Sequence, residues 1–135
     1  MKRDYKLFTD GGARGNPGPA AIGGVLFDER NGIRAQFSVY IGRATNNESE
    51  YRALLHGLQL AKKFRITHIR CFLDSELLVK QLNFVYKVKD KELARFFLDV
   101  HNLRTRFQSI SFAHIPRERN QLADALVNKA LDAHR

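Results

Sequence analysis

Four acidic residues stand where the hydrophobic pattern does not call for a charge. Asp10 and Asp74 each follow an apolar, strand-like run, "YKLFT" and "THIRCFL". Glu50 falls inside the apolar arc of a helix-like segment, and Asp124 lies at the edge of another such arc. Each also has an ordinary interpretation: Asp10 as a turn residue, Asp74 as a helix cap, Glu50 as a first-turn acid and Asp124 as a solvated edge residue.

The chemistry changes if the fold brings these four carboxylates into one cleft. At a separation of ~4 Å and an effective dielectric constant of ~20, each close pair costs on the order of 4 kcal/mol. The nearby sequence supplies no set of buried cationic side chains to offset this repulsion. A bound hard divalent cation would offset it, and Mg²⁺ prefers carboxylate and water oxygens. Carboxylates that hold two ions about 3.5 to 4 Å apart suit phosphodiester hydrolysis, because one ion generates hydroxide and the other stabilises the leaving oxygen.

The overall composition favours a nucleic-acid partner. The chain has 23 Lys and Arg against 14 Asp and Glu, a net charge of +9 and a pI near 10.1, and phosphate-rich polymers are the usual partners of such a surface. One cysteine, Cys71, and five histidines without paired ligand spacing argue against a cysteine zinc site and a disulfide framework. No apolar run approaches the ~18 residues of a membrane span, so we expect a cytoplasmic protein without membrane contact.

Hydrophobic periodicity and turn signals predict the elements that must position the carboxylates. We expect a single domain over residues 1–135 with the order βββαβααβα. The strands are expected at 5–9, 21–27, 33–41, 67–74 and 109–115, and the helices at 47–64, 75–82, 90–107 and from 120 onward. Short connections make the first three strands antiparallel, and the helices before later strands make those parallel. The predicted class is therefore α/β, with a mixed five-stranded sheet and helices on both faces.

Four segments resemble, in order and spacing, the signature blocks of type 1 ribonuclease H, most closely its compact archaeal and bacterial members. They read "FTDGGARGNPGPAAIGGVL", "ATNNESEYRALLHGLQLA", "CFLDSELLVKQL" and "HIPRERNQLADALVNKAL". Together they span nearly the whole chain, and each contains one of the four carboxylates. Four ordered blocks are far more specific than a single glycine pattern.

The resemblance implies an activity and a metal set. It makes Asp10, Glu50, Asp74 and Asp124 the catalytic, metal-binding residues, with Asp10 touching two Mg²⁺ ions in the presence of substrate. Asp124 would serve the ion that activates water, and Glu50 and Asp74 the ion on the leaving-group side. The implied reaction is endonucleolytic hydrolysis of the RNA strand of an RNA/DNA hybrid, leaving a 5′-phosphate and a 3′-hydroxyl. Mn²⁺ is a possible alternative metal.

The resemblance also implies residues that contact the substrate. We expect Gly11 and Gly12 to let the backbone approach the minor groove, where RNA displays its 2′-hydroxyls. Arg43 and Thr45 resemble a phosphate pocket for the DNA strand. For all of these positions ordinary turn chemistry is the alternative. Contacts to ribose and bases are implied for three asparagines, Asn16, Asn46 and Asn47.

The chain departs from the family pattern before its last carboxylate, where many relatives carry a loop histidine. His114 alternates with Ile110 and Phe112, which predicts a packed strand histidine, so Arg117 is the candidate for the auxiliary catalytic role. It would act by charge and hydrogen bonding, because an arginine does not shuttle protons near neutral pH. Glu76, where relatives commonly have a neutral side chain, would add repulsion if it faced the substrate.

Two further functions stay open at the level of sequence. One is a ribonuclease H-fold module that binds hybrid or duplex with weak or no hydrolysis, because a fold alone does not establish an activity. The other is an enzyme that also cuts double-stranded RNA, which displays 2′-hydroxyls across a wide minor groove. The basic, aromatic segment 84–96 is a candidate for contact with the DNA backbone. No obligate protein partner is evident.

Overall fold

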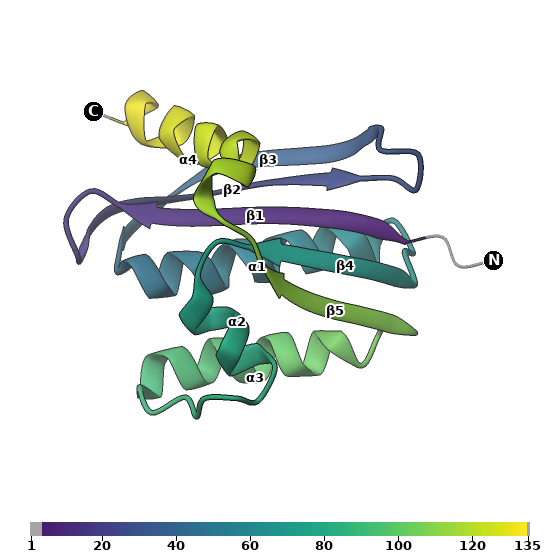
Figure 1. Ribbon diagram of the computed structural model, residues 1–135. Helices are drawn as coiled ribbons and strands as arrows, with labels where there is room; N and C mark the ends of the chain where they lie inside the picture. Colours follow the sequence, from purple (N-terminus) through teal and green to yellow (C-terminus); the bar gives the residue numbers. More distant parts are fainter. Residues whose placement is uncertain (1–3, 135) are drawn as a thin grey trace.

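Two tight turns fold the first third of the chain into an antiparallel meander. It consists of β1 (Tyr5–Ala13), β2 (Gly18–Phe27) and β3 (Ile33–Ala44). β4 (His68–Leu73) then pairs in parallel with β1, and β5 (Ser109–His114) pairs in parallel with β4. The computed structural model, which describes residues 4–134, thus has the strand order β3-β2-β1-β4-β5 (Figure 1). The predicted mixed sheet of three antiparallel and two parallel strands is confirmed.

Helices cover both faces of this sheet, as predicted. They are α1 (Asn46–Lys63), α2 (Glu76–Leu82), α3 (Lys91–Arg104) and α4 (Gln121–Ala133), with a 3₁₀ turn, η1 (Arg117–Arg119), before α4. α1 packs on β1 and β2 from one side, and α4 crosses the other side over β1 to β3 (Figure 1). None of the helices within residues 4–134 combines the length and apolar character of a bilayer-spanning helix.

The main hydrophobic core lies between the sheet and α1, with α2 and α3 closing it. Its fully buried side chains include Leu7, Tyr51, Leu54, Leu58 and Leu78. A smaller cluster under α4 contains Ala21, Val127, Ala130 and Leu131. β1 and β2 are therefore held between two helix layers, and close packing of this kind leaves their side chains little freedom to move.

The predicted end of the first strand is wrong. β1 does not stop at Thr9 but continues to Ala13, and Asp10 stands opposite Gly23 inside the ladder. β2 correspondingly begins at Gly18, and the turn lies between the two. Glycine and alanine have weak strand preferences, but three of the four partners in this stretch of the hairpin, Gly23, Ala21 and Ala20, are also small, so the ladder can continue where α1 and α4 press on it.

Candidate active site

Asp10 is a buried strand residue and not a turn residue. It is 7% exposed and comes from the middle of β1. One of its carboxylate oxygens, Oδ1, accepts a hydrogen bond from the Gly11 N–H at 3.0 Å. The turn interpretation of Asp10 is thereby excluded, and the central strand of the sheet presents a carboxylate to the cleft beside it.

Glu50 reaches the same point from the first turns of α1. Thr45 caps this helix by accepting from the N–H of Glu48, which fixes where the helix begins. Glu50 is 7% exposed, and its Oε1 accepts from the Gly11 N–H at 3.0 Å, so that one backbone donor is shared between Glu50 and Asp10. Its other oxygen, Oε2, is buried with no hydrogen-bond partner among residues 4–134.

Gly11 makes this approach of β1 to α1 possible. A Cβ at Gly11 would lie 2.3 Å from the backbone carbon and oxygen of Ser49, closer than any real side chain is found. A Cβ at Gly12 would meet nothing nearer than Val127 Cγ1 at 3.7 Å, an ordinary contact. The first glycine is thus required by packing, a reason that the sequence analysis did not foresee. The expected role in approach to the minor groove stays a prediction for both.

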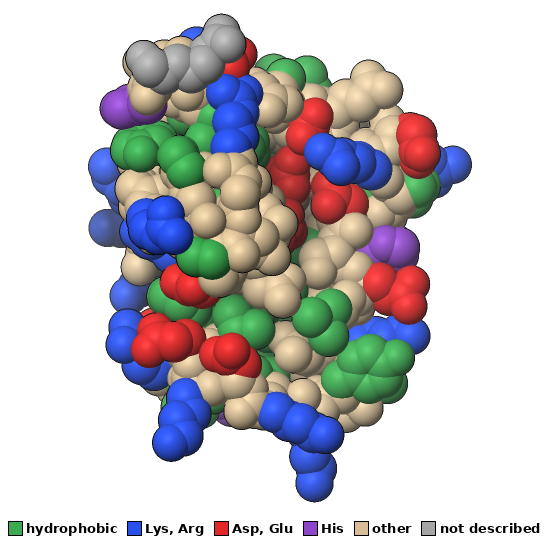
Figure 2. All heavy atoms as spheres, turned by 90° about the vertical axis from the view of Figure 1, so that its left-hand side faces the viewer, with side chains coloured by type: hydrophobic (Ala, Val, Ile, Leu, Met, Phe, Trp, Pro, Cys, Tyr) green, Lys and Arg blue, Asp and Glu red, His purple; other side chains and the backbone are tan. Residues whose placement is uncertain are grey.

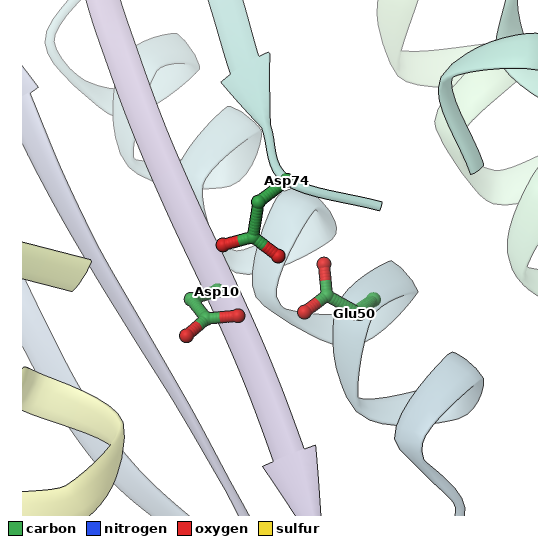
Figure 3. A group of neighbouring side chains, drawn as sticks. All are labelled: Asp10, Glu50 and Asp74. Carbon is green, nitrogen blue, oxygen red and sulfur yellow. The ribbon is translucent and has the colours of Figure 1, made fainter. Parts of the chain in front are cut away.

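Asp74 completes a cluster of three carboxylates. It follows β4 directly and does not cap α2, because Ser75 does so by accepting from the Leu78 N–H. Oxygens of Asp10, Glu50 and Asp74 all lie within 4.8 Å of one another. Figure 3 shows their carboxylates, from β1, α1 and the end of β4, turned toward a common point. Four residues far apart in the sequence were expected here, and three converge this closely.

Asp124 lies on the same cleft but outside that group of three. It sits in the first turn of α4, and its Oδ1 is 3.4 Å from Arg117 Nη2, with Asn128 Nδ2 3.4 Å from its Oδ2. The cleft has a volume of about 450 Å³, and all four carboxylates and Arg117 line it. Figure 2 shows acidic side chains along this hollow. The structure therefore pairs Asp124, whose side chain is only partly buried, with an arginine.

The electrostatics of the cluster oppose full ionisation in the absence of a cation. Burial, followed by the charges of Asp74 and Asp124, raises the pKa of Asp10 from 3.8 to about 6. Burial and the neighbouring Asp10 carboxyl raise the pKa of Glu50 well above its usual range. Three converging carboxylates and an unpartnered buried oxygen are the donor set of a hard divalent cation, so the residues fit such an ion.

The expected substrate residues fall into three groups. Gly11, Gly12, Asn46 and Asn47 line the acidic cleft, together with Arg14. A second hollow, of about 240 Å³, lies beyond it and is lined by Asn16, Thr45, Asn47, Glu48, Asp90, Glu92 and Leu93. Arg43 is exposed on β3 and lines neither hollow.

Two of these asparagines also brace the hollow. The Asn46 N–H donates to Asn16 Oδ1 at 3.0 Å, and Asn46 Oδ1 accepts from the Ala13 N–H at 2.9 Å. The turn between β1 and β2 is thereby tied to the start of α1. At Asn16 a turn role and a substrate role are therefore compatible. Its side chain stabilises the β1–β2 turn and also lines the second hollow.

The two departures from the family pattern have local explanations. His114 is exposed at the end of β5, so the expectation of a packed strand histidine is wrong. Glu76 is exposed too and pairs with Lys80 one turn later, Oε1 to Nζ at 3.0 Å. The hydrogen bond from Lys80 lowers the pKa of Glu76. The concern that Glu76 adds an unpaired charge is thereby reduced, because Lys80 offsets it.

Sequence reasoning missed three residues at the site. Arg14 and Asn128 line the cleft, and Arg14 is held by Asp132 at 2.6 Å. Asn120 is 1% exposed and donates from Nδ2 to Asp74 Oδ2 at 2.8 Å. In the sequence Asn120 signals only a helix start, and nothing in its spacing shows that the side chain turns inward.

Comparison with known proteins places this fold and cleft in a class. Residues 8–130 match the family described as reverse transcriptase-like. A curated relative, ribonuclease HI of Halobacterium salinarum, is 45% identical over 93% of this chain and 63% of its own length. A bifunctional protein of Mycobacterium tuberculosis is 42% identical over 93% of this chain and 35% of its own length. The chain thus spans less than two thirds of the length of these relatives.

Solved structures agree with the sequence relatives. Ribonuclease H1 of Halobacterium salinarum superposes with a TM-score of 0.94 at 43% identity, over 96% of this chain and 98% of that one. LC11-RNase H1 in complex with RNA/DNA hybrid gives a TM-score of 0.92 at 41% identity, over 96% and 98%. The chain belongs to the reverse transcriptase-like family, as a member of its type 1 ribonuclease H group.

Proposed function

We propose that this chain is an endoribonuclease that hydrolyses the RNA strand of RNA/DNA hybrids, with two Mg²⁺ ions bound in the presence of substrate. The observation that carries the proposal is that carboxylate oxygens of Asp10, Glu50 and Asp74 lie within 4.8 Å of one another in the cleft. A relative with the same fold is described in complex with RNA/DNA hybrid, which supports the choice of substrate.

Some residues of the cleft would bind the cations, and others position the carboxylates that bind them. Asp10, Glu50 and Asp74 would hold the cations, and bound divalent ions supply an activated water and stabilise the leaving oxygen. The Gly11 N–H keeps the Asp10 and Glu50 carboxylates side by side, so the site is formed before substrate arrives. Asp124, on the same cleft, would serve the ion that activates water, and its exposed partner Arg117 would be the auxiliary residue that acts by charge and hydrogen bonding.

The polar rim would recognise the hybrid. Gly12 lines the cleft without a side chain and would let the hybrid approach the backbone. Asn46 and Asn47 line the same cleft and would contact ribose and bases. Asn16 and Thr45 line the second hollow, but Glu48, Asp90 and Glu92 also line it and would repel a phosphate placed inside. The phosphate contact to the DNA strand would therefore come from Arg43, which is exposed on β3. Cys71 is buried and unpaired, which supports a reducing, cytoplasmic location.

A substrate panel tests this function directly. End-labelled RNA/DNA hybrid, double-stranded RNA, single-stranded RNA and double-stranded DNA are each incubated with the protein and Mg²⁺ or Mn²⁺, beside Asp10→Asn and Asp74→Asn. We expect efficient cutting of the hybrid alone and inactive but folded variants. Cleavage that survives either substitution overturns the metal assignment. Binding of hybrid without cleavage by the unmodified protein identifies a binding module, and cleavage of double-stranded RNA widens the substrate class.

A further inference from the structure

Asn120 stands at a helix start but does not behave as a helix cap. It precedes α4, a position where an asparagine side chain usually accepts from the backbone of the first turn. Here it forms no capping bond. The side chain is instead turned into the protein and is 1% exposed. The buried amide is therefore free of any capping role and available for other contacts.

The Asn120 amide nitrogen bridges two segments that carry the carboxylates. Nδ2 donates to the backbone oxygen of Thr9 at 2.8 Å and to Asp74 Oδ2 at 2.8 Å. Thr9 is the neighbour of Asp10 in β1. The Asn120 backbone oxygen also accepts from the N–H of Asp124 at 3.1 Å. One residue thus connects β1, the end of β4 and the first turn of α4.

The donor that restrains Asp74 is neutral, and this matters for a cation site. An arginine or lysine in the same place would fix the carboxylate but also cancel its charge. The ion pairs found among residues 4–134 do not include Asp74. Asn120 Oδ1 is buried without a hydrogen-bond partner in the described part of the chain. A buried amide oxygen without a partner carries a desolvation cost, so stability alone does not favour this orientation.

We propose that Asn120 is a positioning residue for the hydrolytic site: its amide holds the Asp74 carboxylate in register with β1 and α4 while leaving its charge available to a cation. The inference rests on the proposed function. Partners that orient ligands in this way typically change metal affinity 10- to 100-fold when they are removed, on the order of the effect expected here.

The test substitutes Asn120 and measures metal binding apart from turnover. Asn120→Ser places a residue that is favoured at helix starts, but its side chain is too short to bridge Thr9 and Asp74. Asn83→Ser is the matched control, because Asn83 Nδ2 donates to the backbone oxygen of Phe112 at 3.1 Å and ties α2 to β5 away from the cluster. Mg²⁺ affinity is measured by titration calorimetry, and kcat and KM are measured on the hybrid.

We expect Asn120→Ser to lose roughly 10-fold or more in Mg²⁺ affinity and to lower kcat, with KM for the hybrid changed less than about 2-fold. Asn83→Ser should leave the Mg²⁺ affinity unchanged. Equal Mg²⁺ affinity in folded Asn120→Ser and unmodified protein overturns the inference. These affinities are informative even if the unmodified protein cuts no hybrid, which would instead overturn the proposed function.

A second measurement needs no substitution and covers the case in which Asn120→Ser does not fold. In the unmodified protein, the side-chain amide protons of Asn120 should exchange slowly with solvent. Their NMR signals should also shift when Mg²⁺ is added, because the amide donates to a carboxylate that takes part in binding. Asn83 provides the reference amide, which should not shift. Fast exchange, or an Asn120 signal that Mg²⁺ leaves unmoved, contradicts the assignment.

Discussion

A single backbone N–H, that of Gly11, serves both Asp10 and Glu50, and this bond explains much of the site's character. The two buried carboxylates share this one hydrogen-bond donor, although a buried carboxylate ordinarily has several. Because so few hydrogen bonds offset the loss of solvent, burial raises the pKa of both side chains, that of Asp10 to about 6. The fold thereby builds a site whose fully ionised form is unfavourable until a cation or a proton binds.

The Asp10 carboxylate is expected to destabilise the protein when no metal is bound. A pKa raised from 3.8 to about 6 corresponds to a cost of up to about 3 kcal/mol at pH 7. Asp10→Asn should therefore raise the free energy of unfolding in the presence of EDTA by about 1 to 3 kcal/mol while abolishing cleavage. Urea denaturation of both proteins measures this. A less stable Asp10→Asn protein contradicts the electrostatic account.

The same shift predicts a pH dependence whose sign can be stated. Because the folded pKa of Asp10 is higher than its unfolded value, the folded state binds the proton more tightly. The free energy of unfolding of the metal-free protein should then fall as pH rises from about 4 to about 6, on account of this group. The difference in unfolding free energy between the unmodified protein and Asp10→Asn isolates the contribution of Asp10. This difference should grow as the pH rises from about 4 to about 6. A difference that stays constant from pH 4 to 7 contradicts it.

Arg117 offers a test of the auxiliary catalytic role. Its side chain is 78% exposed and pairs with Asp124 at 3.4 Å, and exposed ion pairs contribute under about 1 kcal/mol. Arg117→Ala should leave stability nearly unchanged and lower kcat on the hybrid, since Asp124 then lacks its charge partner. Arg119→Ala, in the same 3₁₀ turn, is the control. Equal kcat values for the two variants would remove Arg117 from the catalytic set.

At the scale of elements, the site exists because β1 passes directly against the first turn of α1. Asp10 stands inside the strand ladder and Glu50 inside the helix, so neither carboxylate depends on a loop for its position. Gly11 is the contact point between the two elements, because its missing Cβ is the space that Ser49 occupies. Sites built on strands and helices hold their geometry more closely than sites on loops.

Two neighbouring glycines give a matched pair of substitutions. Gly11→Ala should destabilise the protein by at least about 2 kcal/mol, because the new Cβ would overlap the Ser49 backbone. Gly12→Ala should change stability by less than about 1 kcal/mol, because its Cβ has room. It should nevertheless weaken hybrid binding by placing a methyl group on the cleft floor. Unfolding midpoints and hybrid affinities check both, and the reverse order of stabilities contradicts the packing argument.

At the scale of the whole molecule, a protein of net charge +9 gathers four acids in one cleft and exposes basic side chains around it (Figure 2). The segment between α2 and α3 is one such surface. Phe84, Val85 and Tyr86 are exposed there, beside Lys87 and Lys89. It leads into Asp90, which lines the second hollow with Asn16 and Thr45. The sequence-based expectation of contact with the DNA backbone stays a prediction.

Salt dependence tests that surface. Neutralised phosphates release counterions, so hybrid affinity should fall steeply with salt, and each lost contact should reduce the slope of log affinity against log salt by about 1. Lys87→Ser with Lys89→Ser should therefore reduce it by about 1 to 2. Lys62→Ser with Lys63→Ser, at the far end of α1 from Glu50, is the charge-matched control and should leave the slope unchanged. Equal slopes for the two pairs exclude this segment from the interface.

The sequence by itself determined the order of the elements, the mixed sheet and the identity of the acids. These follow from periodicities of two and 3.6 residues, which are local and survive in the sequence. The end of β1 was missed because its pairing depends on the partner strand and on two helices, and the weak strand preference of "DGGA" pointed the other way.

Only the tertiary structure decided which carboxylates meet and how they are restrained. Asp10, Glu50 and Asp74 converge while Asp124 is drawn toward Arg117, Gly11 is required by Ser49, and the Asn120 side chain turns inward to Asp74. Each of these contacts joins residues that lie apart in the chain, and each depends on directions of side chains set by packing. A local sequence pattern holds no information on the distances between residues that are far apart in the chain. The residue types therefore predicted the chemistry of the site, and the fold determined its geometry.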